Sequence, residues 1–196
     1  MKELILGSQS PRRREILNFF SVPFIQAASD FDETRVPFHG DPEAFVREVA
    51  IQKAASLLES YPDHPILTAD TVVAMDGRLF LKPESPEEAF GMLKELSGKK
   101  HSVFTGVCVT RGKERFSGVE EAFVKFHSLS DSEIHAYHES FHPFDKAGAY
   151  AIQRGGSVIV KRIEGCYYNV MGLPLNTTRS LLAKIGINLW DFLKPL

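Results

Sequence analysis

The sequence has little cysteine and no long apolar run. Its 196 residues include only two cysteines, Cys108 and Cys166, too few for a disulfide framework or a cysteine-based zinc site. We expect both to be reduced. No apolar run approaches about 18 residues, and no charged and then apolar leader opens the sequence, so neither a membrane span nor secretion is indicated. A cytoplasmic protein without a membrane partner is expected.

An excess of basic residues is also missing. The 23 Lys and Arg residues are balanced by 25 Asp and Glu residues, which gives a formal net charge of −2. Proteins that wrap a nucleic-acid polymer usually carry a basic excess on one face, so we expect no such partner, while a small anionic ligand stays open. The length suits a single domain over residues 1–196, because no linker-like or repeated segment divides the chain.

What the sequence does contain is an irregular alternation of strand and helix patterns. Asp76-Gly77 is the dipeptide that best fits a tight type I′ hairpin, and Ser85 and Ser130 each begin a helix with capping-box spacing. Asn176 is placed to cap a last helix. Because hairpins occur among the alternating elements, we expect an α/β fold with a mixed twisted sheet and helices on its faces. The expected strands cover residues 4–6, 22–25, 65–75, 78–81, 101–110, 116–126 and 157–163, and the expected helices begin at residues 11, 42, 86, 131 and 177.

The turn between the first strand and the first helix is rich in hydroxyls and cations. Ser10 is placed to cap the helix, and Pro11 stands at its first position. Residues 12–14 are all arginine, and the positive end of the helix dipole makes each of them unfavourable by about 0.3–1 kcal/mol. A bound phosphate would offset this, using backbone N–H groups, the arginines and the hydroxyls of Ser8 and Ser10. A capped surface helix with solvated arginines is the alternative.

Three further residues are candidates for chemistry. Asp70 lies within the apolar strand pattern 66–73, and because aspartate is depleted from strand interiors, we expect its carboxylate to serve a site, for example by orienting a water. Lys53 borders the apolar stripe of the helix that begins at residue 42, so its head either stays in water or reaches a site. Lys82 precedes Pro83 in an extended loop, where an ordinary exposed lysine is the alternative.

The candidate metal ligands are acidic and histidine residues. Glu33 lies in the acidic loop 30–33 and could present oxygens to Mg²⁺, which prefers one or two carboxylates plus substrate phosphates and waters. A solvated loop is the alternative. His135 and His138 share a helical face, but His142 falls beyond the expected helix end and no acidic partner completes a zinc set. Cations, carboxylates and one poised aspartate together suit metal-assisted attack of water on a phosphate chain.

Six motifs, in order, resemble those of the Maf family of nucleotide pyrophosphatases, over residues 4–187. The resemblance implies a fold like that of inosine triphosphate pyrophosphatases, with two lobes around a long cleft, and hydrolysis of a nucleoside triphosphate to the monophosphate and pyrophosphate. It also implies a divalent cation, Mg²⁺ or Mn²⁺, and a homodimer. The motifs are Ser8-Gln9-Ser10-Pro11-Arg12-Arg13, Thr68-Ala69-Asp70-Thr71-Val72, Lys82-Pro83, Leu96-Ser97-Gly98 with His101-Ser102-Val103, the stretch from Asp145 to Gln153, and Asn169-Val170-Met171-Gly172-Leu173-Pro174.

The resemblance also assigns roles to residues. Asp70 matches the family's catalytic acidic residue, described as a proton acceptor. Arg12, Thr71 and Gln153 match positions tied to substrate choice and have the identities of the subgroup that acts on dTTP and UTP. We expect Glu33 and Asp70 to share the metal and the activation of water. The residues expected to hold the triphosphate are Ser8, Ser10, Arg13, Lys53 and Lys82.

Two residues depart from the family pattern. Arg154 stands where glycine is usual, and Cys166 stands where an acidic residue is usual. Arg154 would either crowd the base pocket or add a phosphate contact, and Cys166 would remove a charge near the cleft. Two alternatives to dTTP and UTP hydrolysis stay open. The family's association with septum formation allows a nucleotide-binding regulator with little turnover, and the same chemistry would also suit a pyrophosphatase for 7-methyl-GTP or another modified nucleotide.

Overall fold

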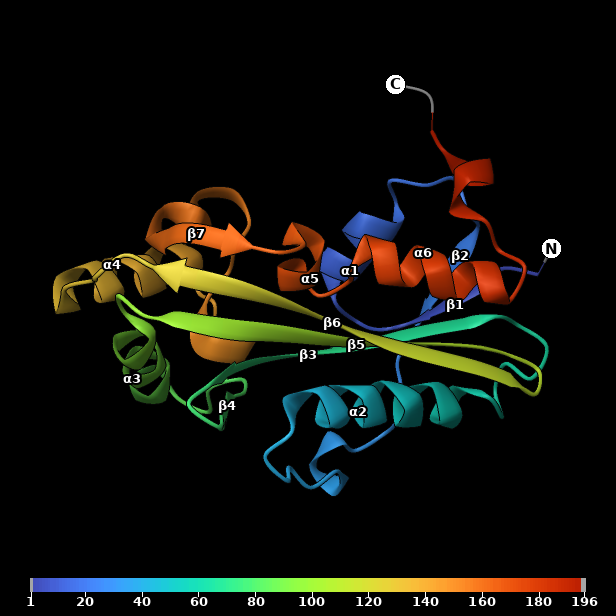
Figure 1. Cartoon of the computed structure of the whole chain (residues 1–196), viewed down its shortest axis with the longest axis horizontal. Coiled ribbons are helices and arrows are strands. Elements are labelled where there is room, and N and C mark those ends of the chain that lie inside the picture. Colours follow the sequence, from blue (N-terminus) through green and yellow to red (C-terminus); the bar gives the residue numbers. More distant parts are fainter. Residues whose placement is uncertain (1, 195–196) are drawn as a thin grey trace.

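The computed structural model describes residues 2–194, without the side chain of Arg154. The strands within this range form one mixed sheet (Figure 1). The strand order is β2-β1-β3-β5-β6-β7, and β4 pairs with β3. β1 is parallel to β2 and β3, and the other pairs are antiparallel, so the predicted mixed sheet is confirmed. The strands are β1 (Leu4–Gly7), β2 (Phe24–Ala27), β3 (Ile66–Met75), β4 (Arg78–Phe80), β5 (Lys100–Arg111), β6 (Glu114–Phe126) and β7 (Val160–Glu164).

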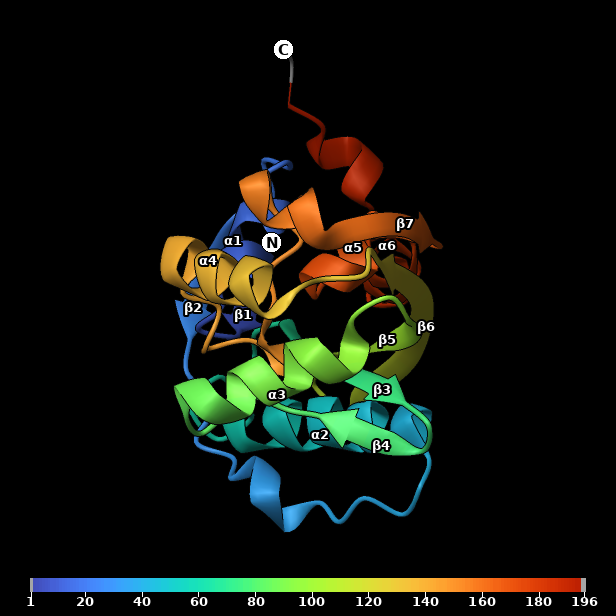
Figure 2. The same cartoon turned by 90° about the vertical axis from the view of Figure 1, so that its left-hand side faces the viewer.

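Helices cover both faces of this sheet. In Figure 1, α2 lies against one face, and α1, α5 and α6 lie against the other. Figure 2 looks along the sheet from the end where α3 and α4 pack. Within residues 2–194, no helix is both long and apolar enough to cross a membrane. The helices are α1 (Pro11–Leu17), α2 (Pro42–Leu57), α3 (Pro86–Leu96), α4 (Asp131–Phe141), α5 (Tyr167–Met171) and α6 (Leu175–Lys184), with short 3-10 turns at Glu33–Arg35, Ala147–Ala149, Arg154–Ile159 and Leu189–Phe192.

Two large hydrophobic clusters occupy the two ends of the long strands. Leu67 of β3 belongs to a cluster formed with α1, α5 and α6, whereas Val73 of the same strand belongs to a cluster formed with α3 and α4. Asp70 and Thr71 lie between them, so the middle of β3 is polar where the two cores separate.

Most of the turn and cap predictions are confirmed. Asp76 and Gly77 have φ angles of 52° and 76°, as a type I′ turn requires. Ser130 forms a complete capping box with Glu133. Ser10 does stand at the N-cap of α1, but its side chain makes no capping hydrogen bond, so that part of the prediction is wrong.

The last quarter of the chain needed three corrections. β7 begins at Val160, because residues 154–159 form a 3-10 helix. Asn176 lies inside α6, and Pro174 is the N-cap, with the extended backbone that a cap needs (φ −66°, ψ 113°). The five-residue helix α5 was not predicted, because it is too short to show helical periodicity.

His101 is a buried histidine near the start of β5. Its Nε2 lies 3.0 Å from the Tyr150 hydroxyl, and the rings of Phe126 and Tyr150 pack against it edge-on. Its Nδ1 is buried without a hydrogen-bond partner. Burial lowers the pKa of His101 to about 4, so the ring is neutral at neutral pH.

This histidine should make the fold sensitive to acid. The folded-state pKa of about 4 lies below the ordinary value of 6.5, so the unfolded chain binds more protons between these two pH values. The stability contributed by the neutral ring is complete above pH 6.5 and is lost as the pH falls towards 4, by about 3 kcal/mol. We expect His101→Gln to flatten this part of the curve of unfolding free energy against pH, measured by urea titration. The exposed His39→Gln should leave the curve unchanged; a wild-type slope in His101→Gln would refute the assignment.

Candidate functional site

The site lies at a gap on one edge of β3. On that edge, β1 pairs with β3 as far as Thr68, and β4 pairs with it only from Val73 onward. Residues 69–72 therefore have a strand partner only in β5. The gap opens just beyond the carboxyl end of β1, the place where ligands bind in open α/β sheets. Asp70 and Thr71 stand in it.

A lysine joins two carboxylates at this gap. The Nζ of Lys53 lies 2.7 Å from Oδ1 of Asp70 and 2.7 Å from Oε1 of Glu33. The side chains of Lys53 and Asp70 are only 11% and 9% exposed, whereas that of Glu33 is 48% exposed. The head of Lys53 thus does not lie in water, and the cluster reaches solvent on its Glu33 side.

α2 delivers Lys53 because it sits very close to the sheet. A Cβ added to Gly106, the β5 partner of Asp70, would stand 2.3 Å from a backbone oxygen of α2. The hydroxyl of Thr68 donates to the carbonyl of Ala50 at 2.6 Å. Asp70 is two residues after Thr68 on one strand face, and Lys53 is three residues after Ala50 on one helix face. The close packing of α2 on the sheet therefore brings the ammonium of Lys53 to the carboxylate of Asp70.

Arg13 occupies the other side of the gap. Its guanidinium donates from Nε to the carbonyl of Gly172 at 2.7 Å, from Nη1 to Oγ of Ser8 at 3.1 Å and from Nη2 to Oγ1 of Thr71 at 3.1 Å. Burial lowers the pKa of Arg13, and the nearby Asp70 carboxylate raises it, so the group stays charged. A guanidinium has five N–H donors. With three engaged here, two remain for an anion.

The three residues that the resemblance implies for substrate choice lie on or near α1 but do not form one contact set. Thr71 is bonded to Arg13, as described above. Gln153 donates from Nε2 to Oε2 of Glu15 at 2.9 Å. Burial lowers the pKa of Arg12, while Asp145 and Tyr150 raise it, and its Nε is buried without a partner. Because Arg12 and Glu15 are three residues apart on α1, Arg12 and Gln153 lie along one side of that helix.

Of the expected phosphate ligands, Ser8 and Ser10 lie together, whereas Lys82 lies apart from them. The backbone N–H of Ser10 donates to Oγ of Ser8 at 3.2 Å, so both serines lie at the turn before α1. Lys82 follows β4, the strand at the far side of the gap, and is exposed. Over residues 2–194 its side chain makes no hydrogen bond or ion pair with the other site residues.

The described residues favour a metal bound together with substrate over one held by the protein alone. No group of three or more His, Cys, Asp or Glu side chains within residues 2–194 is arranged to hold a metal ion. Glu33 and Asp70 each give one oxygen to Lys53, which leaves a second oxygen on each. Two such carboxylates fit Mg²⁺ or Mn²⁺ that takes its other ligands from phosphates and water.

His135 and Cys166 lie in surroundings that the structure describes. His135 stacks on Phe90 at 4.6 Å between ring centroids, which gives it a structural partner. Cys166 is a free, half-buried thiol at the start of α5. The expectation for the side chain of Arg154 lies outside the described residues.

Three site contacts come from residues whose chemistry the sequence did not reveal. Glu15 holds Gln153, Gly172 accepts from Arg13, and Thr105 bonds to Thr71. Thr105 stands in an apolar strand, and its partner on β3 is set by the strand register. The one sequence signal for these contacts was that Gly172 belongs to the motif at residues 169–174, but the sequence did not indicate what this motif does.

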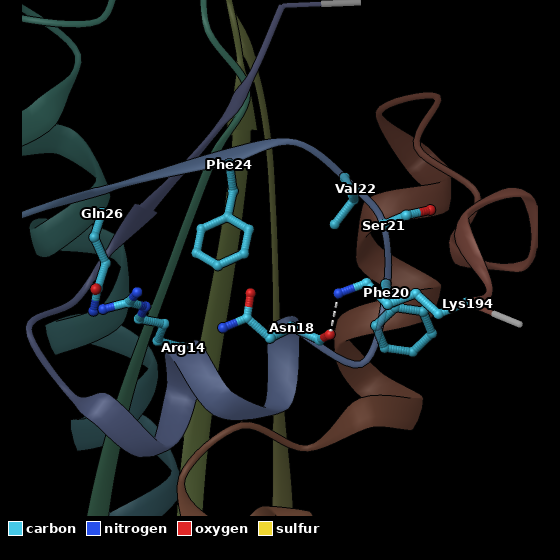
Figure 3. A pocket seen from close by; sticks show the side chains of 8 residues that line it. All are labelled: Arg14, Asn18, Phe20, Ser21, Val22, Phe24, Gln26 and Lys194. Atoms are coloured by element: carbon cyan, nitrogen blue, oxygen red, sulfur yellow. Dashed lines mark hydrogen bonds between the residues drawn. The ribbon is translucent and has the colours of Figure 1, made fainter. Parts of the chain in front are cut away.

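A separate hollow lies between α1 and β2 (Figure 3). Its volume is about 500 Å³. Arg14 lines this hollow, whereas Arg12 and Arg13 do not, so the side chains of the three successive arginines lie in different surroundings. Its other lining residues are Asn18, Phe20, Ser21, Val22, Phe24, Gln26 and Lys194, and the ammonium of Lys194 donates to the carbonyl of Asn18 at 2.6 Å.

The fold and the site define a mixed α/β protein whose sheet edge carries cations and carboxylates suited to a polyphosphate. A family model described as Maf-like protein matches residues 3–185. The dTTP/UTP pyrophosphatase of Chlamydia caviae is 46% identical over 192 residues, covering 97% of this chain and 98% of that protein. The nucleoside triphosphate pyrophosphatase of Chlamydia muridarum is 41% identical over 192 residues, with the same coverage. The chain belongs to the Maf family.

A solved structure also aligns with this chain. It is the Ham1 protein of Staphylococcus aureus, with a TM-score of 0.47 and 10% identity, over 98% of this chain and 94% of that one. We draw no inference from this alignment. The family membership rests on the sequence matches, which span nearly the same residues as the resemblance did.

Proposed function

We propose that this protein hydrolyses dTTP and UTP to the nucleoside monophosphate and pyrophosphate. The observation that carries the proposal is the buried pair of Lys53 and Asp70 at the sheet gap, with the Arg13 guanidinium nearby. Relatives at 46% and 41% identity carry the names dTTP/UTP pyrophosphatase and nucleoside triphosphate pyrophosphatase, which supports the same reaction.

The residues divide the work by charge. Arg13, with two N–H groups free, binds phosphate oxygens, and the hydroxyls and N–H groups of the Ser8 and Ser10 turn lie beside it. Lys53 holds the carboxylate of Asp70 in place through their ion pair, and this carboxylate accepts a proton from the attacking water. Lys82 approaches the phosphates from the far side of the gap once substrate is bound. A divalent cation held by Glu33, Asp70 and the substrate would neutralise charge on the phosphate chain.

The base is proposed to lie beside α1. Arg12 and Gln153 lie along one side of this helix, and Gln153 has an amide oxygen and one amide N–H left after its bond to Glu15. Both a donor and an acceptor suit the edge of a pyrimidine. Gln153→Ala is therefore expected to weaken discrimination among bases more than it slows dTTP; an unchanged substrate profile would remove Gln153 from this role.

The test of the function is pyrophosphate release from dTTP, UTP, CTP, GTP and 7-methyl-GTP, with Mg²⁺, with Mn²⁺ and with EDTA. We expect metal-dependent turnover of dTTP and UTP well above that of the purine nucleotides. Fastest turnover of 7-methyl-GTP would reassign the substrate class. Nucleotide binding without pyrophosphate release would replace the enzyme with a nucleotide-binding regulator.

Three further properties are proposals, the homodimer from the family resemblance and the other two from the sequence. They are a single domain over residues 1–196, a homodimer in solution and a cytoplasmic location. Multi-angle light scattering decides the second: a molar mass near the 21.9 kDa of one chain would refute the dimer.

A further inference from the structure

A chain of hydrogen bonds runs from the site into the core. Nη2 of Arg13 donates to Oγ1 of Thr71 at 3.1 Å, this oxygen lies 3.0 Å from Oγ1 of Thr105, and that hydroxyl lies 3.0 Å from the carbonyl oxygen of Asn169. Thr71 and Thr105 face each other across β3 and β5, so the strand register creates their contact. Thr105 and Asn169 are completely buried.

The hydrogen-bond chain ends at a guanidinium on one side and at a backbone carbonyl on the other. These two ends fix the position of both hydroxyl protons between them. A carbonyl only accepts and a guanidinium only donates, whereas each threonine hydroxyl has one proton. Thr105 must give its proton to Asn169, because otherwise two oxygens would face each other at 3.0 Å without a hydrogen. Thr105 then accepts from Thr71. Thr71 is left with lone pairs only, which is what the Arg13 guanidinium needs.

Residues in α5 and just after it accept hydrogen bonds at both ends of this hydrogen-bond chain. Asn169 accepts from Thr105, and Gly172, which follows the helix, accepts from Nε of Arg13 at 2.7 Å. Gly172 has a φ of +106°, and a Cβ there would stand 3.2 Å from Oγ1 of Thr71, so a side chain would disturb the contact. The Asn169 to Gly172 motif thus supplies two backbone carbonyls that hold one arginine in place.

We propose that Thr105 is a positioning residue for the substrate: it fixes the Thr71 hydroxyl as an acceptor and thereby orients Arg13. This inference rests on the proposed function, in which the free N–H groups of Arg13 bind phosphate. Without the Thr105 hydroxyl, Thr71 turns its proton freely, and the Arg13 guanidinium loses one of its three fixed contacts.

The test compares kcat and KM for dTTP in a set of variants. Thr105→Val keeps the branched shape and removes the hydroxyl, and we expect it to lower kcat/KM about tenfold. Thr105→Ser, which keeps the hydroxyl, should stay within about threefold of the wild type. Thr110→Val is the matched control: Thr110 is also buried on β5, but its hydroxyl has no partner, so its loss should leave the kinetics unchanged.

A double variant separates positioning from general weakening of the core. If Thr105 acts through Thr71, Thr71→Val with Thr105→Val should be no slower than Thr71→Val alone. Losses that multiply would overturn the inference, as would wild-type kinetics in Thr105→Val.

Failure of the proposed function would look different. In that case the wild type itself would turn over neither dTTP nor UTP. The affinity of the same proteins for a non-hydrolysable dTTP analogue would then decide the inference, with the same pattern expected. Absence of binding by the wild type would overturn the inference as well.

Discussion

Asp70→Asn is expected to lower kcat for dTTP hydrolysis by about 10³-fold, with little change in stability. An amide cannot accept a proton from the attacking water, and it carries no charge to share with a divalent cation. It does keep the volume of the carboxylate and an oxygen that accepts from Lys53, and the ammonium of Lys53 keeps its ion pair with Glu33, so the packing and the charge balance around this buried residue survive. Pyrophosphate release and thermal unfolding, measured on the same preparation, test both halves of this expectation.

The control for Asp70→Asn is the same change elsewhere on the hairpin. Asp76 stands in the turn with a φ of 52°, a conformation that asparagine also tolerates, so Asp76→Asn should keep full activity. Undiminished dTTP hydrolysis in Asp70→Asn would mean that another residue accepts the proton. Loss of the folded state in Asp70→Asn would instead show that the charge of Asp70 is structural.

Lys53→Met is expected to reduce both activity and stability. Removing the ammonium leaves the buried Asp70 carboxylate uncompensated and facing Glu33, which should lower the unfolding free energy by about 3 kcal/mol. Turnover should fall by more than about 100-fold, because a cation near the reacting phosphate is lost. Urea unfolding and dTTP hydrolysis measure the two effects.

A double variant tests the physical reason. Adding Asp70→Asn to Lys53→Met removes the unpaired buried charge, so stability should largely recover while activity stays lost. The exposed pair of Lys2 and Asp63 provides the comparison, since Lys2→Met should change stability by less than about 1 kcal/mol. Equal losses in the two lysine variants would show that burial of Lys53 has no special effect.

Local patterns were enough for most of the elements. The Asp76-Gly77 hairpin and the Ser130 capping box depend on neighbouring residues alone, and both formed as predicted. Local patterns did not predict helix α5 or the residue at which β7 begins. α5 is too short for periodicity, and the strand expected from residue 157 begins later because a 3-10 helix replaces its start.

The candidate site was only partly accessible from sequence. Asp70 and Arg13 stood out because their types are unusual at their positions, a carboxylate in a strand and a cation in the first turn of a helix. Lys53 could not be decided in this way, since a lysine beside an apolar stripe usually extends into water. Its burial depends on how closely Gly106 lets α2 approach.

The sequence by itself determined the mixed α/β class, the family and the chemical types at the site, because these follow from residue identity and local spacing. The tertiary structure alone decided which of these groups touch. The register of β3 and β5 set Thr71 against Thr105, the depth of α2 brought Lys53 to Asp70, and the end of β1 left the gap in which they meet. Each contact joins segments far apart in the chain, so no local pattern contains it.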